Sequence, residues 1–150
     1  MTIGALQAAK HACAVSGWTL SNLQLQKILY LAHMIYAGRT GLPLVRREFE
    51  AWDYGPVIPS VYRAASIFGA KPVRNVFHAI EDADPIVNSE ELKMIEDAVA
   101  AFSNLPPFKL VEITHDKHSA WAKHYDSCNK GKEIPFESIL EEYEARFSKQ

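Results

Sequence analysis

The chain has 150 residues, of which 48% are hydrophobic, which is enough for one domain with a sizeable core and too little for two comfortable ones. Its formal net charge of −2 and its pI near 6.3 argue against a general binder of nucleic acids or anionic membranes, because such proteins normally carry a basic excess. We therefore expect a single domain over residues 1–150.

Cysteine usage and the N-terminal composition bear on the compartment. Cys13 and Cys128 are the only cysteines and do not form a Cys-x-x-Cys pair, and no basic region followed by an apolar signal segment opens the chain. No uninterrupted apolar run approaches the roughly 20 residues that a membrane-spanning helix needs. These features predict a cytoplasmic protein without a membrane partner.

The first two predicted helices follow from apolar spacing and end signals. Apolar residues at helical intervals predict an amphipathic helix within residues 3–16, which Gly17 can end in a left-handed conformation. Ser21 and Gln24 have the spacing of a capping box and open a helix that runs to about residue 37, before Gly38 breaks the pattern. Because this helix is apolar nearly all round, we expect it at the centre of a mainly α, compact fold.

A short β ribbon is compatible with the middle of the chain. Residues 44–51 alternate weakly between apolar and polar side chains, as a short strand or extended loop would, and residues 73–80 could form a second extended segment that pairs with it. Between them, Pro59 to Phe68 has the pattern of a short helix ended by Gly69. The fold expected is thus helical with room for a two-stranded ribbon.

The C-terminal half is predicted to be helical. Asn88 gives a cap signal for a helix that keeps one apolar face until Pro106, and a shorter helix follows from Phe108 toward Ile113. The last segment repeats apolar residues at three- and four-residue steps, so it forms a helix with one apolar stripe that we expect to face the core. Its polar side chains are placed on the other face: Glu137, Glu141, Glu142 and Arg146.

The run from Glu48 to Arg63 carries the most information about function. It reads Glu-Phe-Glu-Ala-Trp-Asp-Tyr-Gly-Pro-Val-Ile-Pro-Ser-Val-Tyr-Arg, and its two prolines push the residues before them toward extended backbone. Trp52 and Tyr54 therefore have a stiff support. For Trp52 we favour a core role, since aromatic side chains dominate ordinary cores, while for Tyr54 a structural and a recognition role are both open.

This run and its neighbours resemble the Panacea-domain family of SocA-like antitoxins, which is bacterial and also met among phage-associated proteins. Glu50 to Pro59 and Val61 to Arg63 match the central motif, and Leu23 to Ala32 is similar to the first long apolar helix of the family. Gly41 to Leu44 looks like the Gly-x-Pro-Leu turn that follows that helix, and Ile113 to Trp121 resembles its Thr-His element with a later Trp. Ala120 departs from the pattern, where the family commonly has Pro.

The resemblance implies an antitoxin that neutralises a cognate protein toxin by direct binding. The toxin would be encoded by a neighbouring gene, and delivery of that toxin to an ATP-dependent protease is a second mechanism that the resemblance implies. A stiff aromatic corner suits such binding, because little ordering is needed when the partner docks. The candidate partner-binding residues are Trp52, Tyr54, Tyr62, Arg63, His115 and Trp121.

Two of these candidates have structural alternatives. His115 lies beside an expected helix end, where a histidine can donate to free carbonyls and complement the helix dipole. Trp121 suits an anchor that packs its segment onto the helical core, with an interface hot spot as the alternative.

Catalytic readings find little support in the sequence. His115, His118 and His124, with Asp116 nearby, are the only cluster that suggests a metal-assisted hydrolase, but the His-Glu-x-x-His pattern and a third-ligand spacing are missing. No Gly-x-Ser-x-Gly elbow or phosphate loop occurs. We therefore predict no catalytic residue, no metal and no cofactor. A DNA-binding regulator using Arg46 and Arg47 is a further alternative, disfavoured by the acidic charge balance.

Overall fold

The computed structural model describes residues 2–77 and 90–147, and its centre is helix α2, Asn22–Thr40. The predicted capping box is confirmed, because the Ser21 hydroxyl accepts from the backbone N–H of Gln24 at 3.2 Å and the Gln24 side chain accepts from that of Ser21 at 3.0 Å. Most of the side chains of α2 are buried. The helix ends at Gly41, whose φ of 78° is a left-handed conformation that favours glycine.

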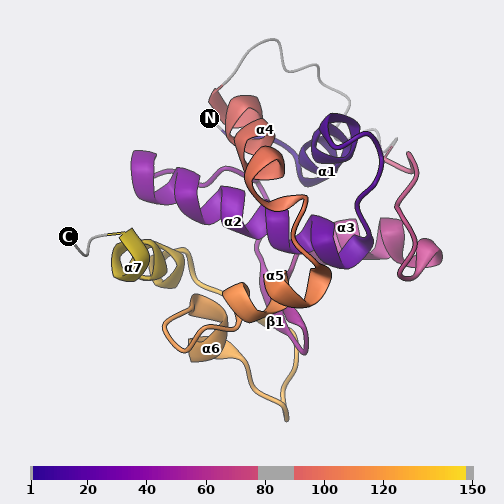
Figure 1. Cartoon of the computed structure of the whole chain (residues 1–150). Coiled ribbons are helices and arrows are strands. Elements are labelled where there is room, and N and C mark those ends of the chain that lie inside the picture. Colours follow the sequence, from indigo (N-terminus) through magenta and orange to yellow (C-terminus); the bar gives the residue numbers. More distant parts are fainter. Residues whose placement is uncertain (1, 78–89, 148–150) are drawn as a thin grey trace.

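The other long helices surround α2, which runs across the middle of Figure 1. They are α1 (Ala5–Val15), α4 (Glu90–Phe102), α5 (Pro107–Thr114) and α7 (Phe136–Phe147), and each packs against α2. The prediction of a mainly α fold around a central apolar helix is thus confirmed. No helix in the described part of the chain combines the length and apolarity that a bilayer crossing requires.

The central helix is longer than its sequence pattern predicts. Gly38 does not end α2, which continues to Thr40. A Cβ atom at Gly38 would lie 2.0 Å from Cγ of Tyr143, so this glycine lets α7 approach the helix closely. Gly38 is therefore a packing residue, and the helix ends where Gly41 supplies the left-handed backbone.

A small antiparallel sheet has strand order β2-β1-β3. β1 (Glu50–Trp52) and β2 (Gly55–Val57) form a hairpin, and β3 (Lys132–Glu133) pairs with the other edge of β1. The β ribbon is confirmed, but the prediction that residues 73–80 pair with it is wrong for the described residues 73–77. Val73 instead donates its N–H to the carbonyl of Leu20, and residues 78–80 lie outside the described residues.

Short helices complete the chain around the hairpin. α3 (Pro59–Ala65) continues into the 3-10 turn η1 (Ser66–Phe68) and ends at Gly69, as predicted, and α6 (Ala120–His124) begins at the Ser119 cap. α4 and α5 also lie where apolar spacing predicts them. The predicted cap Asn88 lies outside the described residues.

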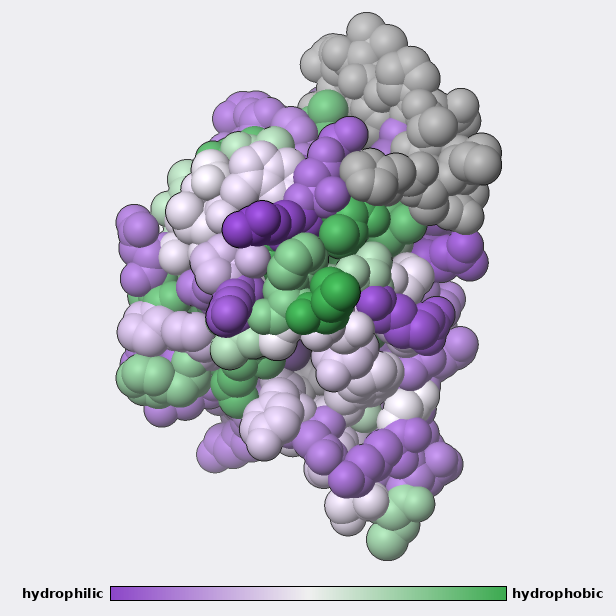
Figure 2. Space-filling model, turned by 90° about the vertical axis from the view of Figure 1, so that its right-hand side faces the viewer, coloured by the Kyte–Doolittle hydropathy of each residue, from purple (hydrophilic) through white to green (hydrophobic). Residues whose placement is uncertain are grey.

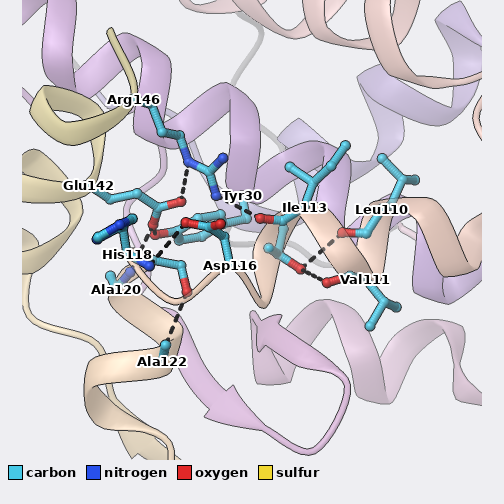
Figure 3. A network of polar contacts seen from close by, with 12 residues as sticks. Tyr30, Leu110, Val111, Ile113, Asp116, His118, Ala120, Ala122, Glu142 and Arg146 are labelled. Atoms are coloured by element: carbon cyan, nitrogen blue, oxygen red, sulfur yellow. Dashed lines mark hydrogen bonds and ion pairs between the residues drawn. The ribbon is translucent and has the colours of Figure 1, made fainter. Parts of the chain in front are cut away.

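A buried polar network fastens α7 to the rest of the molecule (Figure 3). Glu142 is fully buried and accepts hydrogen bonds from the hydroxyl of Tyr30 at 2.6 Å and the N–H of Ala120 at 2.9 Å. Its other oxygen pairs with Arg146 Nε at 2.8 Å, and Arg146 also donates to the carbonyl of Ile113 at 2.6 Å. The prediction that Glu142 lies on the solvent face of this helix is wrong, since it joins α7 to α2 and α6 directly and to α5 through Arg146.

Candidate partner-binding site

A cleft of about 690 Å³ lies between α2, the β1–β2 hairpin and the α3–η1 segment. Its size is in the range of ligand-binding clefts, and its lining combines aromatic and apolar side chains with a few polar groups. Helix α2, the hairpin, the segment from α3 to the turn after η1, and the loop before β3 each contribute to the lining. The residues are Asn22, Leu23, Gln26, Lys27, Glu50, Trp52, Asp53, Tyr54, Val57, Tyr62, Ser66, Gly69, Ala70, Lys130 and Gly131.

Side chains of α2 hold the hairpin from beneath. Lys27 Nζ donates to the carbonyl of Pro56 at 3.0 Å, and the Gln26 side chain accepts from the N–H of Ile58 at 2.9 Å. Gln26 is itself fixed by Asn22, whose side-chain oxygen accepts from Gln26 Nε2 at 3.1 Å. The carbonyl of Pro56 and the N–H of Ile58, which face away from β1, therefore have hydrogen-bond partners on the central helix. These two bonds fix the position of the hairpin relative to α2.

Lys27 is fully buried, and burial lowers its pKa to about 7. The close packing above it explains Gly55, because a Cβ there would lie 2.7 Å from Lys27 Cε and 3.1 Å from Thr114 Oγ1. Gly55 also has a φ of 117°, which side chains rarely tolerate. The glycine of the motif is thus favoured both by the close approach of Lys27 and by the positive φ.

The hairpin tip is held by two residues from later in the chain. Asp53 accepts hydrogen bonds from the hydroxyl of Tyr125 and from Lys130 Nζ, the latter at 2.9 Å. Both donors stabilise the carboxylate, Tyr125 first, so they lower the pKa of Asp53. The backbone of Tyr54 is therefore fixed on both sides, by the contacts of Asp53 before it and by the contact of Lys27 with Pro56 after it, while its ring is exposed.

A stack of rings supports β1. The ring of His115 lies 3.7 Å from that of Trp121 at an interplanar angle of 5°, and Trp121 also stacks on Tyr125. Trp121 Nε1 donates to the carbonyl of Trp52 at 2.6 Å. Trp121 thus links α6 to β1 and also packs, partly buried, against the hydrophobic core, while its role at an interface stays a prediction.

His115 ends α5 as predicted, but its ring stacks on Trp121 while its backbone N–H makes the capping bond. Burial is the main cause that lowers the pKa of its imidazole, and the nearby charge of Lys27 lowers it further. A hydrogen bond with the Tyr54 backbone raises the pKa by less than these two causes lower it. Its Nε2 atom is buried and has no hydrogen-bond partner among the described residues. The His115 ring is therefore a packing surface beneath the hairpin.

The cleft wall is formed by aromatic rings. Trp52 and Tyr62 have ring centroids 4.9 Å apart, and Trp52 Nε1 donates to Glu50 Oε1 at 2.9 Å. Tyr54 is 69% exposed and Tyr62 39% exposed, while Trp52 is half-buried. Arg63 is exposed on α3 but does not line the cleft.

The six predicted site residues thus fall into three groups. Trp52, Tyr54 and Tyr62 line the cleft together, His115 and Trp121 support the hairpin outside it, and Arg63 lies on the neighbouring surface.

The structure adds residues that the sequence reasoning missed, chiefly Lys27 and Gln26 beneath the hairpin and Asp53 with its partners. A signal for Lys27 was available, because a lysine in a helix that is apolar all round must be buried.

The alternative clusters look different in the structure. Within residues 2–77 and 90–147, no three His, Cys, Asp or Glu side chains gather as a metal would require. His118 is exposed, and His124 lies 2.8 Å from the hydroxyl of Ser138. The histidine cluster of the hydrolase hypothesis is therefore not assembled by the described residues. Arg46 and Arg47 are both exposed, as expected for a solvated edge.

Comparison with known proteins bears on this site. Residues 25–122 match the family described as antitoxin SocA-like, Panacea domain, and this range contains the hairpin, the Trp52–Tyr62 wall of the cleft and the stacked rings of His115 and Trp121. The chain belongs to this family. The Panacea-domain match begins within α2 and ends within α6, so it leaves out α7 and its anchor Glu142.

A curated relative shares part of the chain. Over 111 residues the chain is 34% identical to antitoxin SocA of Caulobacter vibrioides (strain NA1000 / CB15N), an alignment that covers 68% of this chain and 58% of the relative. The chain thus spans less than two thirds of the length of that relative. No solved structure matches the chain.

Proposed function

We propose that this Panacea-domain protein is an antitoxin that neutralises a cognate toxin by binding it directly. The observation that carries the proposal is the family motif itself, which forms an aromatic cleft on a hairpin fixed by Lys27, Gln26 and Asp53. The relative named antitoxin SocA supports the same function. In this proposal the chain acts in the cytoplasm, catalyses no reaction and forms one domain.

The docking surface consists of the cleft wall and its exposed rim. Tyr54, Tyr62 and Arg63 contact the toxin, and Trp52, His115 and Trp121 hold the hairpin in position for that contact. A stable complex needs roughly 800 Å² on each partner with a few aromatic or arginine anchors at its centre. Because the hairpin is already fixed, docking orders few side chains.

The apolar surface beside the cleft extends this docking face. α3 and η1 lie at the right of Figure 1, and Figure 2 shows apolar residues gathered in the middle of the face on that side. Ile67 of η1 is 81% exposed, the most exposed of the large apolar side chains described. An exposed apolar patch next to a formed cleft is typical of a protein-binding surface.

The experiment that tests the proposal is co-expression of this chain with the protein encoded by the neighbouring gene. Expression of the neighbour alone should arrest growth, and this chain should relieve the arrest. The abundance of the neighbour separates the two mechanisms: an unchanged amount supports occlusion by binding, whereas a fall that depends on an ATP-dependent protease supports delivery. An arrest that the chain fails to relieve would contradict the antitoxin function.

A further inference from the structure

The carboxylate of Glu50 lies in the cleft without a cation. One of its oxygens accepts from the indole N–H of Trp52, and no Lys, Arg or His among the described residues forms an ion pair with it. The neighbouring Asp53, by contrast, is paired with Lys130. A half-buried carboxylate beside aromatic rings is costly to leave without a counter-charge, so its environment favours a cationic group.

A second carboxylate adds to this charge. Glu50 in β1 lies directly opposite Glu133 in β3, and side chains of directly paired residues point to the same face of a sheet. Like charges in this arrangement repel one another, and Glu133 also lacks an ion pair among the residues described. A cation placed between the two would relieve the repulsion.

The sole buried cation near the cleft among the described residues does not supply this charge. Lys27 donates to the carbonyl of Pro56, and its pKa of about 7 leaves much of its amine neutral at physiological pH. The Trp52 and Tyr62 rings and the Val57 side chain form the apolar part of the wall. The cleft therefore combines an apolar and aromatic wall with an uncompensated negative end.

We propose that the cleft receives an arginine side chain of the toxin, whose guanidinium pairs with Glu50. The inference rests on the proposed function and names the chemistry of the partner. The apolar stem of an arginine suits the wall, and its planar head can bind a carboxylate while stacking on an indole or phenol ring. Arginine is also among the residues that most often dominate protein interfaces.

The first test uses small probes and needs no toxin. N-acetyl-arginine amide and the uncharged N-acetyl-citrulline amide, which has nearly the same shape, are titrated against the protein at millimolar concentrations while the indole N–H signal of Trp52 is followed by NMR. The arginine probe should bind about tenfold more tightly, and Glu50→Gln should remove that difference, because glutamine keeps the hydrogen bond to Trp52 but not the charge.

A matched control separates local pairing from overall charge. Glu48→Gln makes the same charge change two residues away, outside the cleft, and should leave the arginine preference intact. Equal binding of the two probes, absence of binding by either, or an arginine preference that survives Glu50→Gln would each overturn the inference.

The second test uses the toxin encoded by the neighbouring gene. Each arginine of the toxin is changed to glutamine, and the affinity is measured with the wild-type chain and with Glu50→Gln. One toxin arginine should lose about tenfold in affinity for the wild type and little for Glu50→Gln. If the toxin binds and no arginine is coupled to Glu50, the inference fails while the antitoxin function stands; a toxin that does not bind at all contradicts both.

Discussion

Lys27 Nζ lies 3.0 Å from the carbonyl oxygen of Pro56, and this contact joins the centre of the helical core to the hairpin that carries the exposed aromatic rings. A lysine without a carboxylate partner is an expensive choice for a buried position. Its long stem crosses the layer between α2 and the hairpin, and its amine donates to the carbonyl of Pro56. The position of the proposed docking surface thus depends on a residue that the partner need not touch.

Lys27 predicts a dependence of stability on alkaline pH. Its folded pKa of about 7 lies below its ordinary value of 10.5, so the unfolded chain binds more protons between those values. Stability therefore rises as the pH increases from 7, and urea unfolding at pH 7 and pH 9 should show an increase on the order of 1–3 kcal/mol. Lys27→Met should flatten this rise. An equal rise in the variant would mean that Lys27 is not the group responsible.

His33 predicts a loss of stability in acid. It is buried, its Nδ1 accepts from the N–H of Val45 at 3.2 Å, and burial lowers its pKa to about 4. Since the unfolded histidine takes up its proton near pH 6.5, stability falls as the pH decreases from 6.5 toward 4. Unfolding measured between pH 6.5 and pH 5 should show a smaller loss in His33→Gln. His118→Gln serves as the control, because the His118 side chain is exposed to solvent, and its slope should equal that of the wild type.

Gly55 should tolerate no side chain. Gly55→Ala brings a Cβ to 2.7 Å from Lys27 Cε at a φ of 117°, and we expect it to lower the free energy of unfolding by about 1–3 kcal/mol. Gly41→Ala is the matched control, because its φ of 78° is also positive but no atom lies within 4 Å of its Cβ. Chemical denaturation should find Gly55→Ala the more damaging of the two. Equal losses would show that backbone conformation alone accounts for Gly55.

The sequence predicts the local elements well, for reasons that particular residues show. Helix caps, first-turn prolines and left-handed glycines affect only the turn in which they lie, so they can be recognised without the rest of the chain. The examples here are Ser21, Pro59, Gly17 and Gly69. The pairing of β1 with β3 joins residues far apart in sequence, and a strand of two residues is too short for its pattern to predict which strand it pairs with.

Charged residues in the interior were the other source of error. Lys27 can be buried because it donates to the carbonyl of Pro56. Glu142 can be buried because it accepts from the hydroxyl of Tyr30 and pairs with Arg146. Hydropathy places such side chains in solvent, since it contains no term for partners that only folding brings near. The aromatic members of the site could be predicted from the motif, and the apolar surroundings of Lys27 in α2 signal its burial. The contacts by which Lys27, Gln26 and Asp53 position the hairpin could not be predicted, because only folding brings their partners near.

The Glu142 network predicts that α7 is needed for stability of the family domain. Glu142→Ala leaves Arg146 partly buried without its carboxylate and the N–H of Ala120 without its acceptor, so we expect a loss of about 3–5 kcal/mol. Glu141→Ala, which removes a neighbouring exposed carboxylate paired with Lys123, should cost less than about 1 kcal/mol. Thermal unfolding of the two variants measures the difference. Similar melting temperatures would mean that α7 contributes through its apolar stripe alone.

The central claim is that the rim of the cleft binds the toxin encoded by the neighbouring gene. The most direct test is the dissociation constant of that complex, measured with the purified wild-type chain and with variants at exposed aromatic residues. Tyr54→Ala and Tyr62→Ala should each weaken binding at least about tenfold, because they remove the rim of the cleft. Phe108→Ala, which removes an equally bulky ring that is 65% exposed on α5 and outside the cleft, should change the affinity by less than about twofold. Full affinity in both tyrosine variants, or a loss confined to Phe108→Ala, would contradict the account.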